Sequence, residues 1–379
     1  MTTLTGRVVL PDGVLSPGVV RVEGDRIAAI GAGSGEPACW IVPGLVDVHV
    51  HGGGGGSFPS GDEAGARRAA AYHLAHGTTS LLASLVTAAP GAMLRATSTL
   101  AGLCEDGTLA GIHLEGPFLA AARCGAHDPA LLRAPDPGLL DRLLDAGRGH
   151  VRQVTLAPEL PGALDLIARL RDRGVVAAVG HTDASYAEAA AGFAAGAGLA
   201  THLFNAMPPL HHRAPGPVAA ALTAGATCEV IADGVHLDDA TVAMLFATIG
   251  AGRIALVTDA MAAAGLGDGT YTLGPRTVEV SGGVARVGSG AIAGGTATMD
   301  AVLRRVVAAG VSVVEATRAA TLTPARALGL DAEVGALAVG ARADLCVLDA
   351  DLVPVAVMRR GRWVYGGAVV TGSAPPGSR

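Results

Sequence analysis

The chain has 379 residues, half of them hydrophobic. At roughly 150 residues per domain, this length suggests two or three structural units, or one large barrel with a small satellite domain. All 27 basic residues are arginine, which excludes Schiff-base chemistry, a phosphate-loop lysine and a carbamylated lysine that bridges metals. The net charge of −6 argues against a nucleic-acid or anionic-membrane partner.

The cysteines and the N-terminus bear on the location of the protein. The five cysteines are scattered and form no CxxC pair, and no basic-then-apolar segment follows Met1. No uninterrupted apolar block of about 20 residues is present, so no transmembrane helix is expected. We therefore predict a reducing, cytoplasmic location.

Both ends of the chain have the pattern of short strands separated by turn residues such as Pro-Asp-Gly. The strand-like stretches are residues 6–10, 18–31, 39–44, 343–349, 353–367 and 369–372. Residues 373–379 are expected to be a frayed tail. This pattern predicts one small β-sandwich domain made from residues 1–44 and 333–379, with residues 45–332 inserted as a second domain.

The inserted residues alternate between apolar runs and Ala-, Arg- and Asp-rich helical segments, which is typical of βα units around a parallel sheet. The eight apolar runs are GLVDVHV, TTSLLASLV, LAGIHLEG, VRQVTLAP, VVAAVGHT, GLATHLF, CEVIADGVH and IALVTDA. Eight units predict a closed (β/α)₈ barrel of the TIM type in an α/β protein. A doubly wound open sheet is the alternative, but it would normally have a glycine-rich fingerprint after its first strand.

Side chains that can bind metals stand where five of these runs end. They are His49, His51, Glu115, His181, His202 and Asp259. The carboxyl ends of barrel strands meet at one rim, where barrel enzymes hold their active sites. A lone histidine after a strand is more often a hydrogen-bonded core residue, but five such strand ends together predict a nitrogen/oxygen site that suits Zn or Fe.

Other histidines and a glycine-rich stretch have simpler interpretations. Four histidines lie inside apolar runs or on helical segments and are interpreted as structural, namely His73, His76, His113 and His150. The stretch HGGGGGSF at residues 51–58 lacks the lysine of a phosphate loop, so we expect a loop whose backbone passes close to a metal or a ligand.

Eight motifs in the sequence resemble those of the N-acetylglucosamine-6-phosphate deacetylases, a family of the amidohydrolase superfamily. They are HVHGGGGG, HLEGPF, RCGAHDP, GHTDA, THLFNAM, ADGVH, VTDAM and AGGTATMD. The resemblance extends from about residue 18 to residue 365. It implies hydrolysis of N-acetyl-D-glucosamine 6-phosphate to D-glucosamine 6-phosphate and acetate, in amino-sugar catabolism and the recycling of cell-wall sugars.

The resemblance also implies a metal centre. In that family the core metal is held by residues that match Glu115, His181 and His202, with the glutamate in place of the carbamylated lysine of many amidohydrolases. His49 and His51 are retained here, which allows a second ion bridged by Glu115. A divalent metal is expected, Zn first, with Fe, Co, Mn or Cd as alternatives and with one or two ions per subunit.

The remaining roles are carried over in the same way. Asp259 would act as general base and then general acid, and His127 would contact the acetyl carbonyl. The predicted contacts to the sugar phosphate are Arg213, His236, Asn205 and Ala206. A homodimer whose phosphate site is completed by the neighbouring subunit is implied. The stretch HHRAPGP departs from the REPG form of some members, which leaves the local geometry around Arg213 open, together with His211 and His212.

Two alternatives and one regulatory hypothesis remain open. The chain could be an amidohydrolase acting on a cyclic amide or an N-acyl amino acid, or a sugar-phosphate sensor that binds metal without turnover. Cys124 lies just before His127. If that loop is a mobile lid, oxidation of Cys124 would slow turnover, whereas the simpler interpretation is an incidental thiol.

Overall fold

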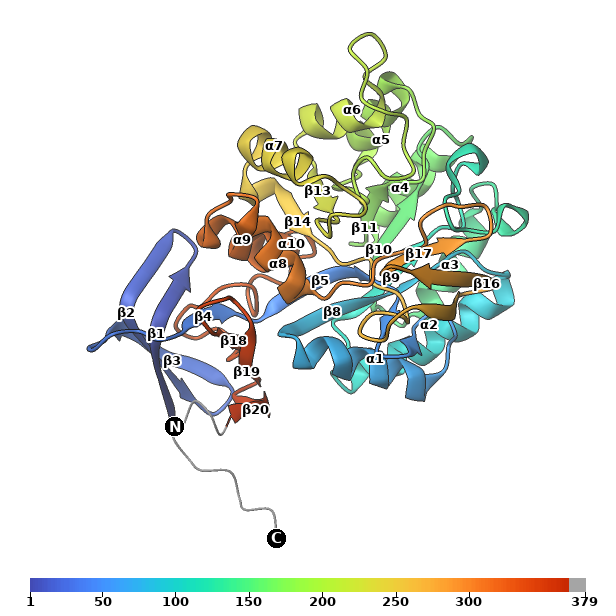
Figure 1. The fold of residues 1–379 in the computed structure, drawn as a ribbon. Coiled ribbons are helices and arrows are strands. Elements are labelled where there is room, and N and C mark those ends of the chain that lie inside the picture. Colours follow the sequence, from blue (N-terminus) through green and yellow to red (C-terminus); the bar gives the residue numbers. More distant parts are fainter. Residues whose placement is uncertain (368–379) are drawn as a thin grey trace.

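A computed structural model describes residues 1–367 as a large βα barrel beside a smaller sheet (Figure 1). The barrel sheet has eight parallel strands that correspond one for one to the eight predicted runs. They are β5 (Leu45–Val50), β8 (Thr78–Leu85), β9 (Gly111–Glu115), β10 (Val151–Leu156), β11 (Val176–Val179), β12 (Leu199–Ala200), β13 (Thr227–Val230) and β14 (Ile254–Leu256). The predicted barrel is confirmed.

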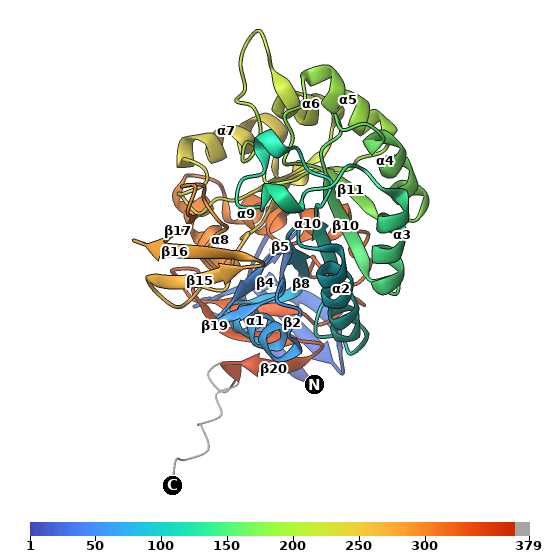
Figure 2. The same ribbon diagram turned by 90° about the vertical axis from the view of Figure 1, so that its right-hand side faces the viewer.

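Helices surround the barrel strands on their outer side (Figure 2). They are α1 (Glu63–Ala75), α2 (Pro90–Glu105), α3 (Pro137–Ala146), α4 (Ala163–Asp172), α5 (Tyr186–Ala195), α6 (Gly216–Ala224), α7 (Asp239–Ile249), α8 (Met299–Ala308), α9 (Val313–Ala319) and α10 (Leu322–Ala327). Their starts follow from local sequence. Asp136 caps α3 in front of a proline, and Ser185 and Glu188 form a capping box on α5.

The first and last barrel strands, β5 and β14, are linked by single backbone hydrogen bonds and not by a regular β-ladder. Asp259 N–H donates to the His49 carbonyl at 2.9 Å, and His51 N–H donates to the Ala260 carbonyl at 2.8 Å. Below this contact, Thr258 Oγ1 donates to Asp47 Oδ2 at 2.6 Å, in a position where both residues are fully buried. The barrel therefore closes at the carboxyl ends of β5 and β14.

The smaller sheet has seven strands, drawn from both ends of the chain. They are β1 (Thr2–Leu10), β2 (Gly13–Glu23), β3 (Arg26–Ala32), β4 (Trp40–Pro43), β18 (Leu345–Leu348), β19 (Pro354–Arg359) and β20 (Arg362–Tyr365). β4 joins the two groups, and inward side chains of both, such as Val20 and Met358, share one core cluster. This sheet supports the predicted two-domain division, whose boundaries stay a prediction. The predicted strand 369–372 and the tail 373–379 lie outside the described residues.

One part of the fold was not predicted. After β14 the chain forms a three-stranded antiparallel sheet of β15 (Gly269–Leu273), β16 (Arg276–Ser281) and β17 (Val284–Val287). Its apolar side packs on Val86 at the end of β8 and on Met261. The insertion therefore lies beside the carboxyl end of the barrel.

The glycine-rich stretch after β5 folds differently from the expectation. It forms a small hairpin of β6 (Gly52–Gly53) and β7 (Gly56–Ser57) against α1. A Cβ at Gly56 would lie 2.1 Å from the Gly65 carbonyl oxygen, and one at Gly52 would lie 2.3 Å from the Gly56 carbonyl oxygen. These glycines allow a close approach to the protein's own backbone, and the expected approach to a metal or a ligand stays a prediction.

None of the helices in residues 1–367 has the length and apolar character needed to cross a membrane.

Candidate metal-dependent active site

Three of the predicted site residues lie just beyond barrel strands in a backbone conformation that side chains rarely adopt. The φ angles are +47° for His181 after β11, +28° for His202 after β12 and +49° for Asp259 after β14. Left-handed backbone at a residue other than glycine costs on the order of 1–3 kcal/mol and is concentrated at functional sites. The chain bends at these points so that the side chains turn over the end of the barrel.

Glu115, at the end of β9, is the centre of the cluster. Its Oε1 lies 3.0 Å from His181 Nε2, 3.1 Å from His202 Nε2 and 3.4 Å from His49 Nε2. Its Oε2 lies 3.3 Å from His51 Nε2. One carboxylate is therefore in contact with all four histidines predicted as ligands.

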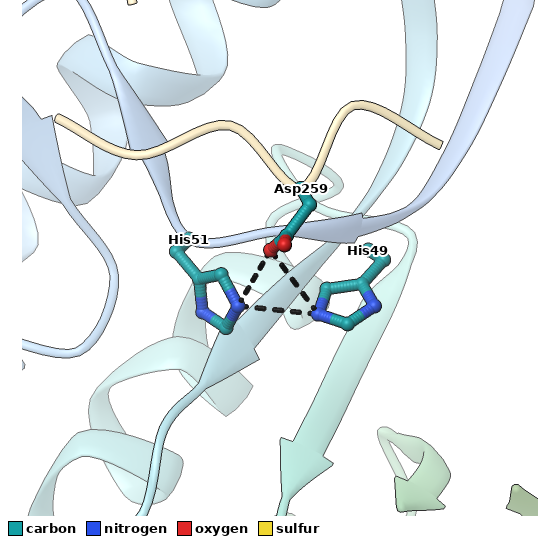
Figure 3. Close-up of side chains that lie close together, drawn as sticks. All are labelled: His49, His51 and Asp259. Atoms are coloured by element: carbon teal, nitrogen blue, oxygen red, sulfur yellow. Dashed lines mark hydrogen bonds and ion pairs between the residues drawn. The ribbon is translucent and has the colours of Figure 1, made fainter. Parts of the chain in front are cut away.

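The second half of the cluster is the group of His49, His51 and Asp259 (Figure 3). Asp259 Oδ1 lies 3.1 Å from His51 Nε2 and 3.5 Å from His49 Nε2, and the two Nε2 atoms are 3.1 Å apart. With Glu115, His181 and His202, these residues form the floor of the site. All six are at most 8% exposed.

Hydrogen-bond partners on the far side of three of the four rings test whether the floor fits a metal, whereas His202 Nδ1 has no partner among residues 1–367. His181 Nδ1 lies 2.8 Å from the Arg123 carbonyl, His51 Nδ1 lies 3.1 Å from the Ser84 carbonyl, and His49 Nδ1 lies 3.0 Å from the Glu229 carboxylate. These oxygens can only accept, so each Nδ1 carries a proton, and it is Nε2 that would give up its proton and offer a lone pair to a cation. The lone pairs converge on Glu115, which is the arrangement of metal-binding histidines.

His127 has the opposite arrangement. The Thr87 N–H donates to His127 Nδ1 at 3.2 Å, so this nitrogen carries no proton and Nε2–H is the donor of the neutral ring. Burial, together with repulsion from His181, lowers the pKa of His127 to about 4. His127 therefore offers a neutral N–H group to the site, 3.2 Å from Glu115 Oε2.

The carboxylates and the histidines of the floor stabilise each other's charged forms. Burial alone would raise the pKa of Glu115, but the surrounding histidines hold it well below its ordinary value. Burial would likewise raise the pKa of Asp259, and His49 and His51 lower it instead. Burial lowers the pKa of His51, whereas Asp259 and Glu115 outweigh burial and raise it to about 9. Both carboxylates are therefore held in the ionised form that a cation requires.

A cavity of about 240 Å³ opens above the floor. Besides floor residues, its lining includes His127, Asn205, Ala206 and His236. The cavity also has an apolar wall, made of Val86, Ala126, Leu273, Ala291 and Ile292. The unpredicted insertion thus supplies Leu273 to the wall, and the chain that follows it supplies Ala291 and Ile292.

Comparison with known proteins places this architecture in a family. The sequence profile of the amidohydrolase family matches residues 40–366. The chain belongs to the amidohydrolase family.

Several proteins similar to this amidohydrolase are deacetylases of amino-sugar phosphates. The chain is 50% identical to N-acetyl-D-glucosamine-6-phosphate deacetylase of Mycobacterium smegmatis, whose D-to-A variant was solved in complex with N-acetyl-D-glucosamine-6-phosphate. The match has a TM-score of 0.93 and covers 96% of this chain and 99% of that one. It is 37% identical to N-acetylgalactosamine-6-phosphate deacetylase of Escherichia coli O157:H7, over 91% of this chain and 94% of that protein. It is 34% identical to N-acetylglucosamine-6-phosphate deacetylase of Bacillus subtilis, over 86% and 84%.

We call the other four predicted residues the mouth residues, namely His236, Asn205, Ala206 and Arg213, of which the first three line the cavity. His236 lines the cavity, and its Nδ1 lies 2.8 Å from Asp233 Oδ2. Burial would lower the pKa of His236, but Asp233 raises it above its ordinary value. In this amidohydrolase the mouth therefore carries a histidine that favours its cationic form.

Arg213 is the predicted mouth residue that does not line the cavity. It lies on the exposed loop before α6, which projects beyond the barrel in both views (Figures 1 and 2). Within residues 1–367, its guanidinium has no hydrogen-bonding partner and it does not line the cavity. The backbone of His211 and Ala214 pairs across a tight turn at the tip, and Leu210 beside it is 47% exposed.

Sequence reasoning missed the residues that support the floor and the mouth. Glu229 on β13 is fully buried and contacts His49, and Asp233 holds His236. The signal for Asp233 was its place three residues before His236 in ADGVH. Glu229 lies in an apolar run. The available signal was that it is a single acidic residue within a strand expected to be buried. Cys124 is half-buried in the loop before His127, and its redox role stays a prediction.

Proposed function

We propose that this amidohydrolase hydrolyses N-acetyl-D-glucosamine 6-phosphate to D-glucosamine 6-phosphate and acetate. The observation that carries the proposal is the floor, in which Glu115 contacts four histidines beside a second carboxylate, Asp259. His236, whose pKa is raised, lines the cavity above it. The named activities of the relatives, at up to 50% identity, support the phosphosugar as substrate.

In this proposal Glu115, His181 and His202 would hold a core divalent cation, and His49 and His51 with Glu115 would hold a second one. Nitrogen and carboxylate donors in this number suit Zn first, with Fe, Co, Mn or Cd as alternatives. A divalent cation bound there would lower the pKa of a water molecule from 15.7 toward about 7 and polarise the acetyl carbonyl.

Asp259 handles the proton of the reaction. It accepts a proton from the attacking water as the new C–O bond forms, and it delivers that proton to the amide nitrogen as the C–N bond breaks. Acetate and the free amine are then the two products. Contact of Asp259 Oδ1 with His51 Nε2 at 3.1 Å keeps the carboxylate over the floor.

His127 stabilises the charge that develops on the carbonyl oxygen. Its Nε2 lies 3.2 Å from Glu115 Oε2, inside the site. The Thr87 N–H donates to Nδ1 and so fixes the ring in the tautomer that carries its proton on Nε2. A donor held in place before the reaction stabilises an oxyanion without reorganisation, and removing one such donor costs about 10²–10³-fold in kcat.

The phosphate group is bound at the mouth by His236 and by Arg213 of a neighbouring subunit, with Asn205 and Ala206 along the sugar phosphate. The unpaired guanidinium on a projecting loop beside the exposed Leu210 supports a homodimer in which this loop reaches a second site. We further propose a cytoplasmic location, where reduced cysteines are the rule and all five cysteines here are free.

Acetate release tests the function directly. Purified enzyme should release acetate from N-acetylglucosamine 6-phosphate, and far more slowly from N-acetylglucosamine at the same concentration. The 6-phosphate of N-acetylgalactosamine belongs in the same panel, since one relative carries that name. Equal rates with and without the phosphate, or faster turnover of a cyclic amide or an N-acyl amino acid, would refute the proposal.

Mixed dimers test the shared phosphate site. Asp259→Asn removes the base from its own subunit, and Arg213→Ala removes the phosphate ligand from its neighbour. A heterodimer of the two variants should regain one complete site, with the wild-type KM for the phosphosugar. If mixing restores nothing although heterodimers form, Arg213 acts within its own subunit or not at all.

A further inference from the structure

Glu229 is a fully buried carboxylate that the reaction described above does not use. It lies on β13 and contacts donors from three other parts of the barrel. Gln153 Nε2 of β10 donates to Oε1 at 2.6 Å, the His202 N–H donates to Oε2 at 3.2 Å, and His49 Nδ1 lies 3.0 Å from the same Oε2. Glu229 therefore links both histidine groups of the floor from below.

The contact with His49 decides which nitrogen of that ring is free. A carboxylate accepts a hydrogen bond, so His49 places its proton on Nδ1 and keeps the Nε2 lone pair toward Glu115 and His51. His51 and His181 obtain the same arrangement from backbone carbonyls, which no substitution at the carbonyl-bearing residue removes. Among these three rings, only that of His49 depends on a side chain.

We propose that Glu229 is a positioning residue that holds His49 in the tautomer able to bind a cation, and thereby sets the affinity of the site for its second ion. The core cation held by Glu115, His181 and His202 depends less on Glu229, because His181 is oriented by the Arg123 carbonyl. This inference rests on the proposed metal centre. It is tested by metal binding, so its failure and the failure of the deacetylase activity are distinguishable.

The test compares two substitutions at one position. Glu229→Leu removes the acceptor at nearly constant volume, whereas Glu229→Gln keeps an amide oxygen for His49. The second variant can retain that contact because Gln153 can reverse its own amide, whose Oε1 has no partner among residues 1–367. Gln153→Leu is the matched control, since it removes a neighbour of Glu229 and leaves the contact with His49 in place.

Zinc binding to the chelated, refilled protein is the readout, by calorimetry and by metal content after dialysis. Wild type and Gln153→Leu should bind two ions. Glu229→Leu should bind the second ion about 10–100-fold more weakly while retaining the first, as expected for a partner of a metal-binding histidine. Glu229→Gln should recover most of this loss. In a His49→Gln background, Glu229→Leu should weaken zinc binding no further.

Several results would overturn the proposal. They are a single ion in wild type, equal losses in Gln153→Leu and Glu229→Leu, no recovery in Glu229→Gln, or additive effects with His49→Gln. If Glu229→Leu does not fold, histidine ¹⁵N NMR of zinc-loaded wild type decides. Binding of zinc through His49 Nε2 with a proton on Nδ1 supports the proposal, and binding through Nδ1 overturns it. Wild type that binds two ions but releases no acetate would refute the deacetylase function alone.

Discussion

The floor and the mouth of the site differ in where their residues lie, in burial and in the contacts that hold the side chains. Floor residues stand on or just beyond barrel strands, are at most 8% exposed, and each contacts at least one other member of the floor within 3.5 Å. Mouth residues lie on loops, and Arg213 is exposed with no partner for its guanidinium among residues 1–367. The proposed function accordingly places the chemistry within one subunit and part of the phosphate site in its neighbour.

The largest expected effect comes from the centre of the floor. Glu115→Gln removes the charge that all four histidines share, so both cations should be lost and acetate release should fall to background. Metal content and turnover are measured on the same preparation. Glu105→Gln, an exposed carboxylate on α2 that pairs with Arg148, is the control and should behave as wild type. Retention of two ions in Glu115→Gln would contradict the central place of this residue.

Asp259→Asn separates proton transfer from metal binding. The amide keeps the size of the side chain but cannot accept a proton, so kcat should fall by about 10²–10⁴-fold. Metal content should stay near the wild-type value, because the other five floor residues are unchanged. Near-normal turnover would remove Asp259 from its proposed role, and loss of metal would make it a ligand first.

Arg213→Ala examines the mouth. Loss of one charged hydrogen bond, worth about 1.5–3 kcal/mol, should raise KM for the phosphosugar by about 10–100-fold. The kinetics of unphosphorylated N-acetylglucosamine should change little, because it carries no phosphate for the arginine to bind. An equal effect on both substrates would show that the loop acts on the site in general and not on the phosphate.

Asp233→Asn should produce the smallest effect, visible in the pH profile. Burial lowers the pKa of His236, and the Asp233 carboxylate raises it above its ordinary value. Without that charge the imidazole loses its proton at lower pH, so phosphate binding weakens earlier as pH rises. The KM of the variant should therefore exceed that of wild type by several-fold at pH values above the ordinary pKa of histidine, and the two KM values should converge as the pH falls. Parallel KM profiles would contradict the proposed cationic histidine.

The sequence predicted the floor of the site better than its mouth. Apolar runs gave the eight strands, and His49, Glu115 and His202 could be placed because the carboxyl ends of parallel strands meet at one rim. Neither the left-handed backbone at His202 nor the path of the loop that carries Arg213 follows from a repeating pattern. Such features depend on packing between segments that are far apart in the sequence.

The insertion after β14 and the buried Glu229 illustrate two further limits. The antiparallel strands at residues 269–287 interrupt the βα alternation, and their packing on Val86 involves residues far away in sequence. Glu229 sits in a run of apolar neighbours, so its contact with His49 on another strand could not be foreseen from spacing. The motifs identified the residues that carry the chemistry. The residues that orient them, such as Glu229, could be found only from the structure.

The seam of the barrel runs through the reacting centre, where the Asp259 amide meets the His49 carbonyl. These residues are more than two hundred positions apart, so one arrives from the ribosome long before the other. The site therefore gains its proposed proton-transfer group only after the last barrel strand has been made, although all five proposed metal ligands precede that strand in the chain. An unfinished or truncated product would be unable to cleave its substrate.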